Sequence, residues 1–183
     1  MTSFSRQKGA ALLVALMILT MVSILGVTAM KTSMFNAKIA TSAQVSAIAF
    51  DGAESAIAAV YDEALFQNQS DPEFLIGKLV SEYVPETGTS VVVDRCVLKN
   101  DVQAKAACND GDRADSRNLL RSGSRVVMKG MATAPYLSTI SNTGGASVSF
   151  VWYEFMAVGE GNVPVFNAER INEQHFSKLG PAF

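Results

Sequence analysis

The chain has 183 residues, of which 49% are hydrophobic and 17% are charged, and its formal net charge is −2. This length leaves room for one domain besides a membrane segment. A weakly acidic chain does not attract phosphate backbones over its whole surface, so the composition argues against nucleic acid as a partner.

The first thirty residues combine a short basic leader with a long uncharged run. Arg6 and Lys8 precede Gly9, and the twenty-one residues from 10 to 30 contain no charged side chain. As a helix, such a run spans about 31 Å, which is the thickness of the hydrocarbon core of a bilayer. We therefore expect residues 1–9 to form a leader peptide and residues 10–30 to form a membrane-spanning helix.

Three interpretations of this segment are open. The small residues Val27, Thr28 and Ala29 suit a secretory signal, although the run is longer than the roughly 7–15 apolar residues of such signals. A single-pass anchor fits the length, but Lys31 and Lys38 weaken any orientation inferred from charge. In the third interpretation, the run is the first half of a longer helix.

Residues 31–66 continue the helical pattern, since no proline precedes Pro72. Apolar side chains recur three and four residues apart, which is typical of a helix that buries one face. These side chains are Val45, Ile48, Ala49, Ala53, Ala56, Ile57, Val60, Tyr61, Ala64 and Leu65. Glu63 and the other acidic residues of this stretch are expected on the remaining faces. The sequence thus predicts one helix of about fifty-five residues, amphipathic over 31–66, with a stop and loop at 67–72.

Beyond this helix the pattern changes to that of strands. Residues 89–98, 125–132 and 147–157 are rich in β-branched residues or alternate in polarity. An edge strand is expected at 163–166 or at 171–176. The candidate core residues of the third strand are Val148, Phe150, Trp152 and Phe155.

These strands predict an α+β fold for residues 67–183. An antiparallel sheet of three or four strands within 89–178 would need cover for its apolar face. The apolar face of the helix, here called the stripe (Val45 to Leu65), supplies it. Asn142 to Gly145 form a turn signal before the third strand. Residues 73–84 are expected to form a short helix in the connection.

The polar stretch 96–124 is expected to be a surface loop held by Cys96 and Cys108. If the domain lies outside the inner membrane, these cysteines form a disulfide, which would stabilise the fold by about 3 kcal/mol. Two free thiols in a cytosolic protein are the alternative. The acidic residues from Asp110 to Asp115 do not follow the order of calcium ligands in an EF-hand, so we expect a solvated loop and no metal. Two cysteines and the lone His175 are also too few for a zinc site.

Several motifs resemble those of known proteins. Lys8-Gly9 before an apolar helix resembles the junction of type IV prepilins. Residues 5–60 resemble the N-terminal segment of PilX-type minor pilins, which are related to GspK-type minor pseudopilins. The motifs that carry this resemblance are Gly9-Ala10-Ala11-Leu12-Leu13-Val14-Ala15-Leu16, Leu25-Gly26-Val27, Met30-Lys31-Thr32, Ala49-Phe50 and Ala53-Glu54. The resemblance implies a type IV pilin-like fold, cleavage between Gly9 and Ala10 by a prepilin peptidase, and N-methylation of Ala10.

Val14 departs from the family pattern, because most pilins of this class carry a glutamate at the fifth residue after the junction. Cleavage leaves a positive α-amino group on Ala10, and burial of an ammonium among apolar side chains is costly without a counter-charge. A carboxylate on a neighbouring subunit offsets that cost, and Val14 cannot supply one. We therefore expect a special position near the filament tip. The alternative is that Val14 is an ordinary membrane residue in a protein that never enters a filament.

The expected function is that of a minor pilin of the type IV pilus, which takes part in an assembly-priming complex. Its expected partners are other minor pilins, the major pilin, the prepilin peptidase and a tip adhesin. It is expected in the inner membrane with a periplasmic C-terminal domain, and then in the pilus at the cell surface. The alternatives are a minor pseudopilin of a type II secretion system and a signal-anchored periplasmic binding protein. No catalytic motif is present, so neither an enzyme nor a cofactor is expected.

Overall fold

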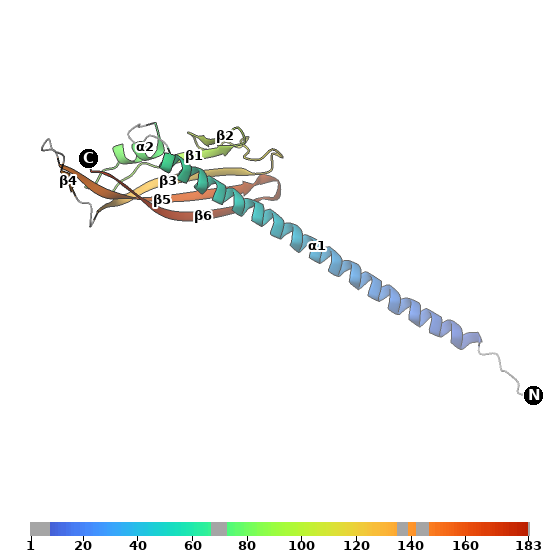
Figure 1. The fold of residues 1–183 in the computed structure, drawn as a ribbon. Coiled ribbons are helices and arrows are strands. Elements are labelled where there is room, and N and C mark those ends of the chain that lie inside the picture. The colour runs from blue at the N-terminus through green and yellow to red at the C-terminus, as the bar shows by residue number, and fades with distance from the viewer. Residues whose placement is uncertain (1–7, 67–72, 135–138, 142–146, 183) are drawn as a thin grey trace, which may run out of the picture. The chain divides into compact units, whose positions relative to one another are not determined.

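The computed structural model describes residues 8–66, 73–134, 139–141 and 147–182, which fall into two units, Met1–Gln44 and Val45–Phe183 (Figure 1). Helix α1 (Lys8–Phe66) contributes its first part to the first unit and its remainder to the second. The predicted long helix is therefore confirmed. Its predicted stop at 67–72 lies outside the described residues.

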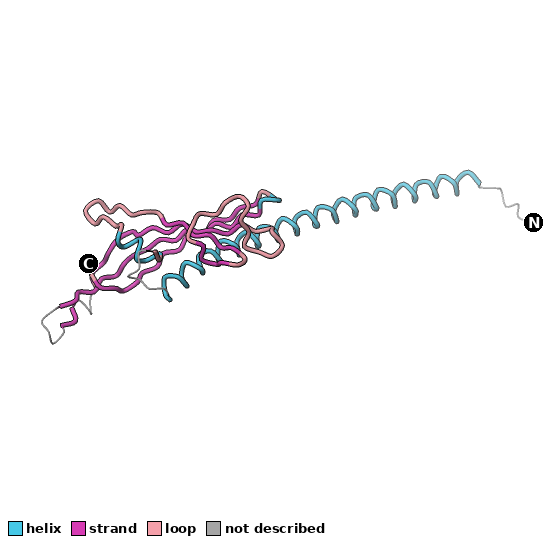
Figure 2. Tube along the Cα trace, turned by 90° about the horizontal axis from the view of Figure 1, so that it is seen from above, coloured by secondary structure: helices cyan, strands magenta, loops and turns pink. Residues whose placement is uncertain are grey.

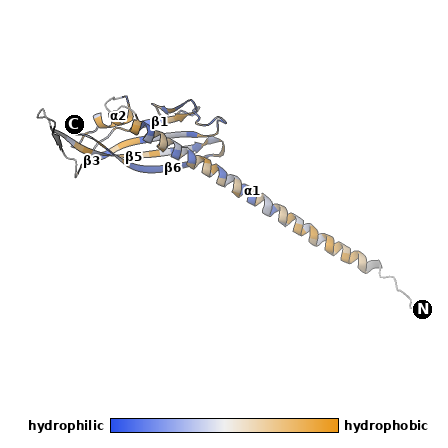
Figure 3. Cartoon of the chain, in the orientation of Figure 1, coloured by the Kyte–Doolittle hydropathy of each residue, from blue (hydrophilic) through white to orange (hydrophobic). Residues whose placement is uncertain are grey.

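The first unit, as far as it is described, consists of α1. Every side chain from Ala10 to Gln44 is exposed. Figure 3 shows mostly hydrophobic residues along this part of the helix. A helix that is apolar all round must find its cover outside its own chain, in a membrane or among other helices.

The second unit is an antiparallel sheet with helices on one face. Its other elements are α2 (Leu75–Ser81), β1 (Val93–Leu98), β2 (Asp101–Ala104), β3 (Arg121–Thr133), β4 (Thr139–Ser141), β5 (Ser147–Val163), the 3₁₀ helix η1 (Pro164–Phe166) and β6 (Ala168–Pro181). The strands run in the order β2-β1-β3-β5, and β4 and β6 both pair with β5. The α+β fold class is thus confirmed.

The sheet is larger than the sequence indicates, since the described residues form six strands instead of three or four. β2 lies inside the stretch 96–124 that was expected to be a loop, and β3 already begins at Arg121. Strands as short as β2 and β4 contain too few alternating polar and apolar residues to be recognised from the sequence. Of the two positions expected for an edge strand, 163–166 is wrong because η1 occupies it, and 171–176 lies in β6.

The last part of α1 covers the sheet with the predicted stripe. Figures 1 and 2 show it lying along β3, β5 and β6. The buried residues of the stripe are Val45, Ala49, Ala53, Ala56, Ile57, Val60 and Ala64, and Gly52, Ala59 and Glu63 are buried beside them. Val60 and Ala64 share a core with α2 and with apolar side chains of β1, β3 and β5. The prediction was wrong at Leu65, which is 62% exposed at the end of the helix.

Two glycines of β5 let α1 approach the sheet closely. A Cβ atom on Gly161 would lie 1.9 Å from the carbonyl oxygen of Ala49, and one on Gly159 would lie 2.3 Å from that of Ala53. From β3, the hydroxyl of Ser122 donates to the carbonyl oxygen of Gly52 at 2.6 Å. The contact between helix and sheet therefore joins backbone to backbone through very small residues.

The alternation of β5 differs from the expected one. The buried side chains include Tyr153, Phe155 and Ala157, whereas Trp152 is 37% exposed on the opposite face. Trp152 and Phe155 have opposite parity in the strand, so they cannot share a face. The large aromatic side chain of Trp152 suggested burial, but its position in the register decides otherwise.

Candidate assembly site

The residues expected to govern processing and assembly lie at the start of α1. Gly9 and Ala10 fall in the first described turn of the helix, and the side chains of Ala10 and Val14 are exposed. Val14 is 54% exposed and continues an apolar surface that runs along the helix. α1 contains one stretch that is long and apolar enough to cross a membrane, judged by length and composition.

Three polar side chains within the uncharged run are satisfied by the helix itself. The hydroxyls of Thr20, Ser23 and Thr28 donate to backbone carbonyls three or four residues earlier, at 2.8, 2.8 and 2.9 Å. Such bonds allow a hydroxyl to lie in an apolar environment without an unpaired donor. These residues therefore suit both a lipid environment and a bundle of apolar helices.

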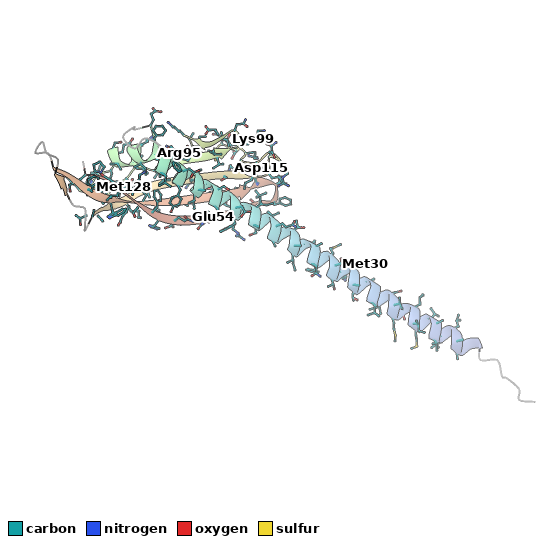
Figure 4. All side chains as sticks on the ribbon, viewed as in Figure 1. Met30, Glu54, Arg95, Lys99, Asp115 and Met128 are labelled. Atoms are coloured by element: carbon teal, nitrogen blue, oxygen red, sulfur yellow. A yellow bond between two sulfur atoms is a disulfide. The ribbon has the colours of Figure 1, made fainter. Side chains whose placement is uncertain are left out.

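A buried ion pair joins the helix to the sheet in the second unit. Arg95 Nε lies 2.7 Å from Glu63 Oε2, and Arg95 Nη2 lies 2.8 Å from Glu63 Oε1, so the pair is bidentate. Their side chains are 6% and 2% exposed. Figure 4 labels Arg95 on β1, beside α1. The expectation that Glu63 lies on a face outside the buried stripe was wrong, because Arg95 compensates its charge inside the domain.

The side chain of Glu63 also caps the N-terminus of α2. Its Oε1 accepts the backbone N–H of Leu75 at 2.9 Å, and Leu75 is the first residue of α2. The residue before it, Phe74, has no side chain that could cap the helix. The carboxylate therefore serves as a cap supplied from another helix, where the N-terminal end of the helix dipole favours negative charge. One side chain thus fixes α1, α2 and β1 together.

The C-terminal end of α1 receives a hydrogen bond from a distant residue. No basic residue lies in its last turn. Lys178 of β6 donates from Nζ to the carbonyl oxygen of Ala64. A cation at a helix C-terminus satisfies an otherwise unpaired carbonyl and complements the helix dipole. Burial lowers the pKa of this lysine below its ordinary value.

A disulfide joins Cys96 of β1 to Cys108 in the structure. The loop that it anchors is ordered further by Asp115, which accepts the backbone N–H groups of Leu119 and Leu120, each at 2.8 Å, and of Arg117 at 3.1 Å. Burial alone would raise the pKa of Asp115, but these hydrogen bonds outweigh it and lower the pKa below its ordinary value.

Charged side chains line a cleft on the face of the sheet away from the helices. The cleft has a volume of about 190 Å³ and lies under Cys108. Arg121 and Arg125 of β3 approach opposite oxygens of Glu160 at 3.7 and 3.8 Å, and Arg125 lies 3.7 Å from Asp94. These two basic and two acidic side chains compensate one another. Arg95 also lines the cleft, but its charge is paired with Glu63, so the cleft carries no excess charge that would attract an ion.

The acidic residues of the loop serve internal contacts. Asp110 pairs with Arg121 at 2.9 Å, and Asp112 accepts the backbone N–H of Asn109 at 2.7 Å. Within the described part of the chain, no group of three or more His, Cys, Asp and Glu side chains is arranged to hold a metal ion. His175 lies exposed on β6, with Nε2 at 2.9 Å from Glu173 Oε1.

Comparison with known proteins gives one match. Residues 8–58 match the family model described as PilX N-terminal. The matched segment is less than a third of the chain, and it contains both the exposed apolar part of α1 and most of the buried stripe. This match supports a type IV pilin-like chain of the PilX kind. No curated protein and no solved structure matches the chain.

Proposed function

We propose that this protein is a minor pilin of the type IV pilus. Helix α1 is the observation that carries the proposal. Residues 10–30 expose apolar side chains all round, whereas the last part of the helix is buried on an antiparallel sheet. The segment that matches the PilX N-terminal family spans both parts. An apolar helix attached to a folded domain suits a subunit that waits in a membrane and then polymerises through that helix.

Processing follows from the same proposal. A prepilin peptidase cuts between Gly9 and Ala10, and the new α-amino group of Ala10 is then methylated. Mass spectrometry of the N-terminus of the mature protein tests this step. An N-methylated Ala10 is the expected result. An intact Met1 would instead support a plain membrane anchor, and a start at Met30 would support a secreted protein.

We further propose that the subunit lies near the filament tip, in a complex with other minor pilins that primes assembly. Val14 supports this placement. A subunit with valine here offers no carboxylate to the α-amino group of a neighbour, and an unpaired buried ammonium is costly. Such a subunit suits a terminal position better than a repeating one. A tip adhesin and the major pilin are then its expected neighbours.

The substitution Val14→Glu tests the placement. It should change the number of pili or the position of the subunit along them, because the new carboxylate can pair with the amine of a neighbour. Val22→Glu is the matched control, since it adds the same charge to the same apolar run away from the junction. Unchanged pili with unchanged incorporation of the Val14→Glu subunit would contradict the tip assignment and leave the pilin assignment intact.

Two other functions use the same parts. A minor pseudopilin of a type II secretion system, of the GspK type, has the same processing but serves protein export. A signal-anchored periplasmic binding protein keeps α1 in the membrane as a monomer. Deletion of the gene distinguishes a minor pilin from a minor pseudopilin, since loss of pili and loss of secretion are different phenotypes. Cross-linking of the membrane-bound subunit to other pilins would exclude the monomeric anchor.

A further inference from the structure

Two lysines and three apolar residues beside them form a surface that the proposed function does not use. Lys31 follows the uncharged run directly, and Lys38 lies seven residues further along the helix. Met34, Phe35 and Ile39 are 64%, 69% and 63% exposed. All five residues belong to the first unit, in which every described side chain from Ala10 onward is exposed.

These five residues share one side of the helix, here called the lysine face. At about 100° per residue, Lys31 and Lys38 lie only about 20° apart, and the five side chains together occupy about 140° of the circumference. The opposite side carries no charge and no large apolar group. Its residues are Thr32, Ser33, Asn36, Ala37, Ala40, Ala43 and Gln44. The segment is therefore amphipathic, with its positive charge on the apolar side.

We propose that the lysine face binds the anionic headgroups of the bilayer from which α1 emerges, before the subunit enters a filament. This inference rests on the proposed insertion of residues 10–30 into a membrane. The two ammonium groups meet lipid phosphates, and Phe35 enters the boundary between headgroups and acyl chains, where aromatic side chains are favoured. Met34 and Ile39 cover part of the same boundary.

The mixture of charge and apolar surface favours lipid over a second apolar helix as the occupant. Packing this face against an apolar helix would bury two ammonium groups without partners, which is costly. At a lipid surface, lysine extends its apolar stem along the acyl chains and keeps its charge among phosphates and water. The opposite side of the helix, with its hydroxyl and amide groups, then faces water.

This binding favours a tilted helix. Lys38 lies eight residues after Met30, which is about 12 Å along an upright helix. The headgroup region on one side of a bilayer is only about 5–8 Å deep. A lean of the helix toward its lysine face, as it leaves the bilayer, brings Lys38 closest to the lipid phosphates, because the side chain already points back toward the membrane. The proposal therefore predicts the direction of tilt.

Tryptophan reporters in the full-length chain test the tilt. The chain has one tryptophan, so Trp152→Phe provides a silent background. Phe35→Trp places a reporter on the lysine face, and Ser33→Trp places one on the opposite side, two residues nearer to the membrane span. Both are reconstituted in vesicles that contain brominated phosphatidylcholine, with and without phosphatidylglycerol. An upright helix predicts stronger quenching at position 33, whereas the proposal predicts roughly twofold stronger quenching at position 35 when phosphatidylglycerol is present.

Charge variants complete the experiment. Lys31→Gln with Lys38→Gln should abolish the effect of phosphatidylglycerol on the reporter at position 35, and high salt should weaken that effect. Lys99→Gln with Lys129→Gln, at two exposed lysines of the second unit, is the matched control and should leave it unchanged. Equal or weaker quenching at position 35 than at position 33 would overturn the proposal, as would insensitivity to the loss of Lys31 and Lys38.

A third reporter separates this inference from the proposed function. Leu19→Trp lies in the middle of the uncharged run and should be quenched in both kinds of vesicle. If Leu19→Trp is not quenched, the membrane insertion itself is wrong. If Leu19→Trp is quenched but position 35 is not favoured over position 33, only the lysine face is wrong. In that case a partner subunit becomes the better candidate for its occupant.

Discussion

Glu63 and Arg95 show how a single pair of side chains holds the second unit together. Both are almost fully buried, both oxygens of Glu63 are engaged by Arg95, and one of them also accepts the first N–H of α2. A buried ion pair is not necessarily stabilising relative to apolar residues, but the loss of one partner leaves an uncompensated charge. The pair therefore makes the arrangement of α1, α2 and β1 sensitive to single substitutions.

We predict that Glu63→Gln lowers the free energy of unfolding by about 3–5 kcal/mol, because it leaves Arg95 buried without a counter-charge. Thermal melting of the detergent-solubilised protein measures the effect. Asp62→Asn, at an exposed neighbour on the same helix, is the control and should have little effect. The double variant Glu63→Gln with Arg95→Met keeps an acceptor for Leu75 and removes both charges, so it should recover much of the loss. A double variant as unstable as Glu63→Gln would contradict this explanation.

Asp115 gives the disulfide loop a dependence on pH. Its pKa is lowered in the folded protein, so the carboxylate contributes stability that is fully present above its unfolded pKa of about 3.9 and is lost as the pH falls through the folded pKa. Asp115→Asn should lower stability at neutral pH by about 1 kcal/mol or less, since solvent screens this partly exposed group. The difference from the unmodified protein should vanish in acid. Asp51→Asn, on an exposed part of α1, is the matched control. A difference that persists unchanged in acid would show that the charge of Asp115 plays no part.

At the scale of elements, the contact between α1 and β5 depends on the absence of side chains. Gly159 and Gly161 face the backbone of Ala49 and Ala53, and no larger residue fits between them. Alanine and glycine in the last part of α1 complete the contact from the other side. A helix can lie this close to a sheet only where both surfaces are free of bulk.

Gly161→Ala should separate α1 from β5 and lower the free energy of unfolding by about 3 kcal/mol, because its Cβ would overlap the carbonyl oxygen of Ala49. Gly130→Ala is the matched control, since a Cβ at that position of β3 meets nothing within 4 Å. Chemical denaturation of both variants measures the difference. Similar stability of the two variants would contradict the close approach of helix and sheet.

At the scale of the whole molecule, the two units differ in where their apolar surface finds cover. The second unit buries its stripe within its own chain, whereas the first exposes its apolar side chains. A chain that begins at residue 40 should therefore be soluble and folded, because it keeps Val45 and everything beyond it. A chain that begins at residue 60 loses most of the buried stripe and should aggregate. Circular dichroism and sedimentation check both results. An insoluble chain from residue 40 would show that the second unit does not cover its own core.

Several features of this protein follow from local patterns that a sequence records directly. The uncharged run needs only its length and composition to be recognised as a candidate membrane span. The stripe from Val45 to Ala64 follows from helical periodicity, and β1, β3 and β5 follow from β-branched residues and alternation. Each of these signals lies within one element, where the spacing of side chains fixes which of them share a face. The junction at Gly9 and the departure at Val14 were found through the resemblance to minor pilins, and both stay predictions.

Only the tertiary structure decides which distant groups meet. The burial of Glu63 depends on Arg95, which lies 32 residues away. The end of α1 depends on Lys178, and the closeness of α1 to the sheet depends on the glycines of β5. Trp152 lies on the open face because the register of the sheet determines its side, although its size and apolar character suggest burial. The sequence by itself thus determined the long helix, its apolar run and the main strands. The tertiary structure alone decided the partners of each polar group, because a charge is stable inside a protein only where another element brings its complement.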